Sequence, residues 1–370
     1  MKDFKVSASK PAVITIVALG IASLAACSNE SGSDNTATTV EQTTADSSLL
    51  QDQWTSVNYH PKDRELTTHY PDGLGYNRHY VVLEARAPNP DSPMRGLRAE
   101  GNTSILFASE GEGSGMGPDN INYQHAAGVW YDDDGNMIFL YYAFAPPAEP
   151  HIWVARGFGK FVGLTGHGKW HWLWPDGWER PEIPEGYEYP NAYEFDWELP
   201  GEDAVDTPMG VIGTTLYADG EGDFRDRATL SLTEPPEWNL TRNFPNGTRL
   251  VQNWLEGSVV AAKEGSPLAG LTIVGQTTEA MEVGPDGTGV IVYQTGMMEF
   301  TAEDGSQIFM FGENRPPAAP RLWVTAATGR FEGLTGDGTW NTSFPDDWGL
   351  PETDAPSVSP WEFAWNLPGQ

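Results

Sequence analysis

The second half of the chain repeats the first. Residues 123–178 align without a gap to residues 293–348 at a constant offset of 170, and 23 of the 56 aligned positions are identical. Shorter matches before and after this block have offsets of 174 and 168, so small insertions or deletions separate the two copies. A unit of this length can bury a core of its own, which indicates a duplicated domain rather than a solenoid repeat. We therefore predict two domains, at residues 51–205 and 206–370, each able to fold alone.

Each copy is predicted to be all-β. Short runs rich in β-branched and aromatic residues, such as 137–144 and 307–311, follow Asp-Gly turns at 134–135 and 304–305. Many short strands separated by Gly, Pro and Asp favour a sandwich or a barrel, and a closed barrel leaves no exposed sheet edge. The fold class that we predict is two tandem small antiparallel β-barrels.

The most strongly repeated block is rich in glycine and covers residues 159–170 in the first copy. Its Gly163, Gly166 and Gly168 permit positive φ or close backbone approach, while Phe161 and Trp170 are expected to fill the core beside them. The pattern predicts a tight turn that leads into a strand.

This block resembles the glycine-rich hairpin of the allene-oxide-cyclase-like and dirigent-like β-barrels. The resemblance is strong in the hairpin, occurs in both copies, and is weak elsewhere. It implies a small antiparallel barrel with an apolar lumen for a small hydrophobic or aromatic molecule. For the cyclases of that superfamily it also implies a reaction without a cofactor, so we expect none. No catalytic residue of the family can be matched to a position of this chain.

The first 26 residues have the order of a secretion signal. Three lysines precede an uncharged, largely apolar run at 12–26, which is shorter than the roughly 20 residues of a membrane-spanning helix. The block Leu24-Ala25-Ala26-Cys27 resembles the lipobox of bacterial lipoproteins, in which the cysteine receives a lipid and becomes the first mature residue. Cys27 is the only cysteine of the chain. The alternative is an ordinary cleaved signal with a chance cysteine.

The stretch that follows Cys27 is rich in Ser, Thr, Asn and Asp and has little to bury, so residues 27–50 are predicted to form a disordered tether. The expected location is the cell envelope, with the lipid as the contact to a membrane. Ser28 follows the cysteine, and the lipoprotein pattern then favours the outer membrane if the organism is Gram-negative.

Charge and cysteine content exclude several classes of partner. The formal net charge of −31 at pH 7 would repel phosphate backbones, so nucleic acid is not an expected partner. Without a second cysteine, neither a disulfide within the chain nor a cysteine zinc site can form.

Five residues are candidates for contact with a ligand. Alternation on the predicted strand at Tyr123 places Gln124 and Trp130 on one face with two small residues between them, and Gln294 repeats the glutamine in the second copy. Such a face suits a lumen with one orienting polar group. The alternative is a core glutamine bonded to backbone. Trp172 and Trp174 have no tryptophan counterpart in the second copy, which favours a specific role over a shared core role.

Candidates for acid or base catalysis are His125 and Glu313, which lie near this strand in the alignment. The second copy has other residues in place of His125 and three further histidines, so the fold does not need them; surface drift and a function confined to the first copy both explain this. His167 and His171 would be about 13 Å apart on a strand, which is too far for one metal ion. No metal site is predicted.

Three functions are compatible with these features. The first is an envelope lipoprotein whose barrel lumen binds a small apolar or aromatic molecule. The second is a cofactor-independent cyclase, isomerase or lyase that acts in one barrel. The third is a structural surface protein whose barrels are filled by side chains.

Overall fold

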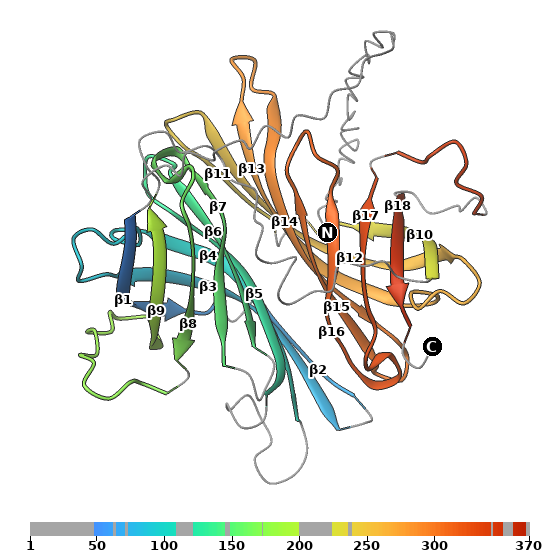
Figure 1. The fold of residues 1–370 in the computed structure, drawn as a ribbon, viewed down its shortest axis with the longest axis horizontal. Helices are drawn as coiled ribbons and strands as arrows, with labels where there is room; N and C mark the ends of the chain where they lie inside the picture. Colours follow the sequence, from blue (N-terminus) through green and yellow to red (C-terminus); the bar gives the residue numbers. More distant parts are fainter. Residues whose placement is uncertain are drawn as a thin grey trace, which may run out of the picture. The chain divides into compact units, whose positions relative to one another are not determined.

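The first copy of the repeat forms a sheet that closes on itself (Figure 1). The computed structural model describes residues 48–61, 64–70, 73–108, 121–144, 149–171, 173–199, 224–235, 239–341, 343–350 and 358–367. The strands of this copy are β1 (Ser48–Tyr59), β2 (Glu65–His69), β3 (Leu74–Arg86), β4 (Arg98–Ala108), β5 (Ile121–Tyr131), β6 (Met137–Phe144), β7 (His151–Phe158), β8 (Thr165–His171) and β9 (Tyr189–Leu199). Their order is β1-β9-β8-β7-β6-β5-β4-β3, with antiparallel neighbours, and β1 also pairs with β3. Eight strands therefore form a closed barrel.

The second copy repeats this topology. Its strands are β10 (Phe224–Thr233), β11 (Leu240–Asn243), β12 (Thr248–Ala262), β13 (Thr272–Val283), β14 (Gly289–Thr301), β15 (Gln307–Asn314), β16 (Arg321–Ala327), β17 (Thr335–Trp340) and β18 (Val358–Asn366). The order is β10-β18-β17-β16-β15-β14-β13-β12, and β10 closes the barrel on β12. The predicted fold class, two tandem antiparallel β-barrels, is confirmed.

In each copy, the remaining strand and the strand that closes the barrel pair with different parts of one and the same strand. In the first copy β1 pairs with residues 82–86 of β3, and β2 pairs with residues 75–79 of the same strand. β2 therefore extends one side of the barrel beyond the point where β1 ends.

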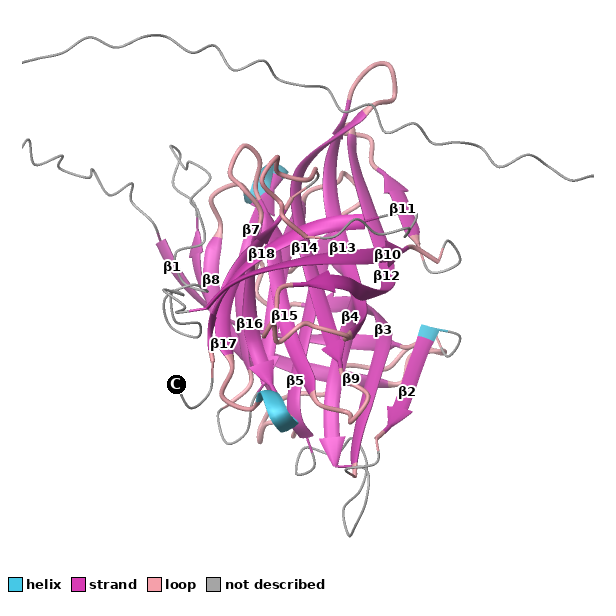
Figure 2. Ribbon diagram, turned by 90° about the vertical axis from the view of Figure 1, so that its right-hand side faces the viewer, coloured by secondary structure: helices cyan, strands magenta, loops and turns pink. Residues whose placement is uncertain are grey.

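Helical structure among the described residues consists of short turns only (Figure 2). Two of these are the 3₁₀ turns η3 (Gly159–Phe161) and η5 (Gly329–Phe331) in the glycine-rich blocks. No helix in the described part of the chain is long and apolar enough to cross a membrane. β1 begins at Ser48, inside the range assigned to the tether, whereas Cys27 and the predicted signal lie outside the described residues.

Alternation along β5 separates two cores. Trp130 belongs to the core cluster of the first barrel, and the even-numbered positions before it face the same lumen. The odd-numbered positions face the second copy: Ala127 packs in a cluster with Met297 and Phe311, and Val129 packs in a cluster with Tyr293. Both faces of β5 are therefore buried, one in its own barrel and one between the barrels. The two barrels together form one compact unit.

The glycine-rich hairpin has the geometry expected from its sequence. Gly163 has a φ of 79°, a conformation that favours glycine. A Cβ atom on Gly168 would lie 2.2 Å from the carbonyl oxygen of Glu194, so the neighbouring strand can approach only glycine there. Phe161 and Trp170 are buried in the barrel core. The aligned residues of the second copy repeat both glycine features.

A buried carboxylate marks the same place in each barrel. In the first copy Asp52 Oδ2 accepts hydrogen bonds from Ser92 Oγ (2.5 Å) and from Trp197 Nε1 (3.1 Å). The second copy repeats the network with Ser266 Oγ (2.6 Å), Trp365 Nε1 (2.8 Å) and Asp226 Oδ2. Since buried carboxylates are costly unless they are hydrogen-bonded, this network ties the first strand, the last strand and the turn before the fourth strand together.

Candidate functional site

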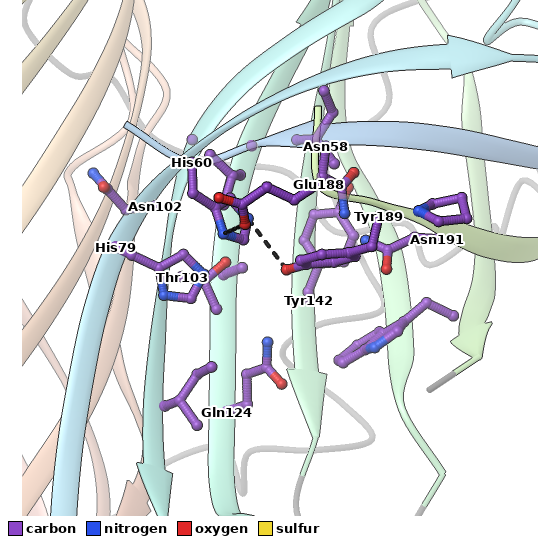
Figure 3. A pocket seen from close by; sticks show the side chains of 18 of the residues that line it. Asn58, His60, His79, Asn102, Thr103, Gln124, Tyr142, Glu188, Tyr189 and Asn191 are labelled. Carbon is purple, nitrogen blue, oxygen red and sulfur yellow. Dashed lines mark hydrogen bonds and ion pairs between the residues drawn. The ribbon is translucent and has the colours of Figure 1, made fainter. Parts of the chain in front are cut away.

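A cavity of about 620 Å³ lies in the lumen of the first barrel (Figure 3). Residues from β1 to β6, from β8 and from β9 line it, together with the segments between β1 and β2 and between β8 and β9. An eight-stranded barrel has an interior just wide enough to be filled by side chains or to hold one small ligand. In the first barrel, small residues on the inner face of β5 leave room for a cavity.

The wall of the cavity is largely apolar. Bulky side chains of this wall are Val81, Leu83, Ile105, Tyr142, Trp170 and Tyr193. In the middle of the inner face of β5 the side chains are small, because Ala126 and Gly128 lie there. A Cβ on Gly128 would lie 3.8 Å from the Tyr142 ring, which is an ordinary contact distance. The space beside β5 therefore exists because these two side chains are missing or small.

The second barrel has larger side chains at two of these places. Met298 replaces Gly128 and Trp361 replaces Tyr193, and both are buried in its core cluster. Tyr142 is replaced by Gly312, but Leu322 and Trp340 pack against that glycine. The two lumens have thus diverged, the first toward an open cavity and the second toward packed side chains at these positions.

A group of polar side chains, which we call the mouth cluster, consists of His60, His79, Glu188 and Tyr189 (Figure 3). His60 Nδ1 lies 3.5 Å from Glu188 Oε2, and its Nε2 lies 3.2 Å from the Tyr189 hydroxyl. The rings of His60 and His79 are 4.7 Å apart. Part of the Tyr189 side chain is exposed, but desolvation of its hydroxyl, together with Tyr193 and Glu188, raises the pKa of Tyr189, so its phenol keeps its proton at neutral pH.

The mouth cluster has a support on the β2 side. His79 Nδ1 lies 2.6 Å from Asn77 Oδ1, and Asn77 Nδ2 donates to Glu65 Oε1 (2.9 Å) and to Thr67 Oγ1 (2.8 Å). The extra strand β2 therefore orients an imidazole at the cavity. Sequence analysis missed His60 and His79, although neither has a histidine counterpart in the second copy and β-alternation places His79 on the same face as Val81.

Only some of the predicted ligand-contact residues lie at the cavity. Gln124 and Trp174 line the cavity, and Trp130 lies next to it, where its Nε1 donates to the Tyr142 hydroxyl (3.1 Å). Trp172 lies outside the described residues. Gln294 faces the interior of the second barrel, where its Nε2 donates to Glu279 Oε1 (2.8 Å).

The predicted catalytic residues do not line the cavity. Glu313 accepts a hydrogen bond from the Tyr293 hydroxyl (3.2 Å) and pairs with Arg315 (3.0 Å). His125 has no exposed surface and points from β5 toward the second barrel, where its Nε2 lies 3.0 Å from Glu299 Oε1. The geometry thus gives both residues contacts that hold the structure, away from the lumen of the first barrel.

His125 belongs to a buried charge cluster between the barrels. Arg78 Nη1 donates to Glu299 Oε2 (3.0 Å), and Ser104 Oγ donates to Glu299 Oε1 (2.6 Å). Arg78 also lies over the ring of Trp254, 4.0 Å from its centroid. Burial alone would raise the pKa of Glu299, but Arg78, His125 and Ser104 together lower it, so the carboxylate is ionised.

The second barrel holds a carboxyl group whose pKa is shifted upward, in the opposite direction to that of Glu299. Burial and the nearby Glu234 raise the pKa of Glu279 to about 7, against the effect of the hydrogen bond from Gln294. Glu279 therefore changes charge near neutral pH inside the second barrel.

Among the described residues, no group of three or more His, Cys, Asp and Glu side chains has an arrangement that could hold a metal ion. Comparisons with protein-family models, with curated proteins and with solved structures found no match.

The variant Glu279→Gln is expected to stabilise the protein above pH 7. The native pKa near 7 exceeds the ordinary value of 4.5, so the native state binds more protons between these values and the free energy of unfolding falls as pH rises. The wild type should lose on the order of 3 kcal/mol from this group, and the variant should not. Urea unfolding at pH 5 and pH 8 measures the difference.

The control is Glu282→Gln, which changes an exposed carboxylate on the same strand. Equal pH dependence in the wild type and in Glu279→Gln would contradict the burial argument.

Proposed function

We propose that this protein is a lipid-anchored envelope protein whose first barrel binds a small apolar or aromatic molecule in its lumen. The observation that carries the proposal is the 620 Å³ cavity, whose apolar wall is joined by polar side chains that include Gln124, Arg180 and the mouth cluster. Ligand pockets typically have volumes of about 300–1,000 Å³ and this mixture of lining residues. A cavity of this size favours binding over a purely structural role for the first barrel.

The difference between the copies supports a division of duties. Gly128 leaves space in the first lumen, and Met298 occupies the aligned place in the second. In the proposal, the first barrel binds the ligand and the second serves as a packed partner. The resemblance to allene-oxide-cyclase-like barrels, whose lumens hold small hydrophobic molecules, supports the same choice of ligand.

Membrane attachment is proposed from the sequence alone, because Cys27 lies outside the described residues. The lipobox-like block Leu24-Ala25-Ala26-Cys27 supports acylation of the cysteine, and several acyl chains together anchor a protein stably. The polar tether would then let the barrels stand away from the membrane surface.

Replacement of the cysteine tests the anchor. In the variant Cys27→Ser, the protein should move from the detergent-extracted membrane fraction to the aqueous fraction, because no thiol remains to accept the lipid. Labelling with an alkyne fatty acid and mass spectrometry of the mature N-terminus measure the change, and Ser28→Ala serves as the control. A wild-type N-terminus that carries no lipid would refute the anchor and leave the cavity proposal standing.

A filled cavity tests the binding function. Gly128→Met introduces the side chain that the second copy has at the aligned position, and the open space beside Gly128 can receive it. We expect binding of a probe such as 2-naphthol to weaken at least tenfold while the unfolding temperature stays the same or rises. Isothermal titration calorimetry measures the affinity, and native mass spectrometry detects any molecule that co-purifies with the wild type.

The matched control for this change is Val162→Met, which adds bulk on the exposed surface. Unchanged affinity in Gly128→Met, or a wild type that neither binds the probe nor carries a co-purified molecule, would argue against a ligand in this lumen.

A second candidate function, catalysis by proton transfer, is favoured by the mouth cluster. A neutral His60 that directs Nδ1–H toward Glu188 has Nε2 as an acceptor, and the protonated Tyr189 phenol lies next to it. Such a pair can move a proton within a bound molecule without a cofactor, as an isomerase or lyase requires. In this reading the cavity binds the substrate and His60 acts as the base.

Loss of the imidazole separates this candidate from simple binding. His60→Asn should lower turnover of the co-purified molecule by about 10²-fold or more with little change in its affinity, because general-base catalysis contributes about that factor. His69→Asn is the control, since His69 is exposed on β2 and does not line the cavity. If a molecule is recovered unchanged from the wild type after long incubation, catalysis is contradicted and only the carrier function remains.

A further inference from the structure

The same glutamine occupies the same place in both barrels. On β5, Gln124 lies opposite Ile105 of β4 and opposite Phe144 of β6. On β14, Gln294 lies opposite residues 279 and 314 of the flanking strands in the identical register. The duplication thus offers two environments for one side chain.

In the second barrel the protein itself satisfies the amide. Gln294 Nε2 donates to Glu279 Oε1 at 2.8 Å, and Asn314 Nδ2 approaches Gln294 Oε1 at 3.5 Å. Both ends of the amide therefore have a polar neighbour on an adjacent strand.

In the first barrel both of these neighbours are apolar. Ile105 stands in place of the glutamate and Phe144 in place of the asparagine, and both are buried. The carbonyl oxygen of Gln124 is buried and has no hydrogen-bond partner among the described residues, although Gln124 lines the cavity. A buried carbonyl oxygen without a partner is unfavourable, which is why such groups in native proteins almost always have one.

We propose that the ligand of the first barrel is a neutral, largely apolar ring compound with a hydroxyl group, and that this hydroxyl pairs with the Gln124 amide. This inference rests on the binding function proposed above. A hydroxyl donates to the carbonyl oxygen and also accepts from the amide nitrogen, so it serves either orientation of the amide. A charged group next to Ile105 and Phe144 would lose hydration without gaining an opposite charge there, so the part of the ligand that meets Gln124 is a neutral group.

The alkyl and aromatic wall recognises the ring. Trp170 and Tyr193 line the same cavity as Gln124 and can contact the faces or edges of a ring system. In the first barrel, the ligand hydroxyl takes the role that Glu279 and Asn314 have in the second.

The test compares 2-naphthol with 2-methoxynaphthalene, which has the same ring system and no hydroxyl proton to donate. Wild-type protein should bind 2-naphthol about tenfold more tightly, as expected for one buried hydrogen bond. In Gln124→Met, which has a similar length and no amide, the ratio of the two affinities should fall toward one. Gln294→Met removes the matched amide from the second barrel and should keep the wild-type ratio.

Each outcome has a separate meaning. If the wild type binds both compounds equally well, the hydroxyl inference is overturned and the binding function stands. If the wild type binds neither compound and no molecule co-purifies, the binding function fails and the inference fails with it. If Gln124→Met keeps a tenfold preference, another polar group recognises the hydroxyl and the assignment to Gln124 is overturned. Because the wild-type ratio needs no variant, the test remains decisive even if a substitution impairs folding.

Discussion

Closure of each sheet on itself is the constraint on which the rest of the structure depends. β1 pairs with β9 along its length and with β3 at its end, and β10 makes the same two pairings in the second copy. Closure gives every strand an inner face and an outer face, so one residue of displacement along β5 decides whether a side chain reaches the cavity or the other barrel. The cavity, the mouth cluster and the packing between barrels are all consequences of that division.

The outer faces of the two copies have become complementary and are no longer equivalent. Arg78 and His125 come from the first copy and Glu299 from the second, whereas the aligned residues Gln252, Thr295 and Val129 are uncharged. A buried ion pair is weak evidence for stability, but removal of one partner leaves an uncompensated buried charge, which costs about 3–5 kcal/mol. The pair is better explained as a device that selects one way of docking the barrels.

The sequence predicted the features that depend on repeats and on alternation, and it missed those that depend on closure. The glycine-rich hairpins and the position of Gln124 on the lumen face follow from local patterns, and the two barrels follow from the repeat and from the resemblance of the hairpin. Alternation on β5 also implies that His125 lies on the face opposite Gln124, but its partner Glu299 is 174 residues away and no local pattern could indicate it. The mouth cluster was missed for the same reason, since His60, His79 and Glu188 meet only because the barrel closes between β1, β3 and β9.

The two copies, finally, show how one fold can have either a packed interior or an open cavity with few substitutions. In the second barrel, Glu279 approaches Gln294 from the neighbouring strand, and its raised pKa shows that burial of this carboxyl carries an energetic cost near neutral pH. In the first barrel, Ile105 avoids that cost but leaves the carbonyl oxygen of Gln124 without a hydrogen-bond partner in the described part of the chain. Either arrangement leaves one unfavourable group in the lumen while the barrel is empty. Only in the first barrel, where Gly128 also leaves room, can a small molecule pair with the unsatisfied group. The presence of Ile105 in place of the glutamate destabilises the empty barrel, and it would for the same reason favour binding of a hydroxylated ligand.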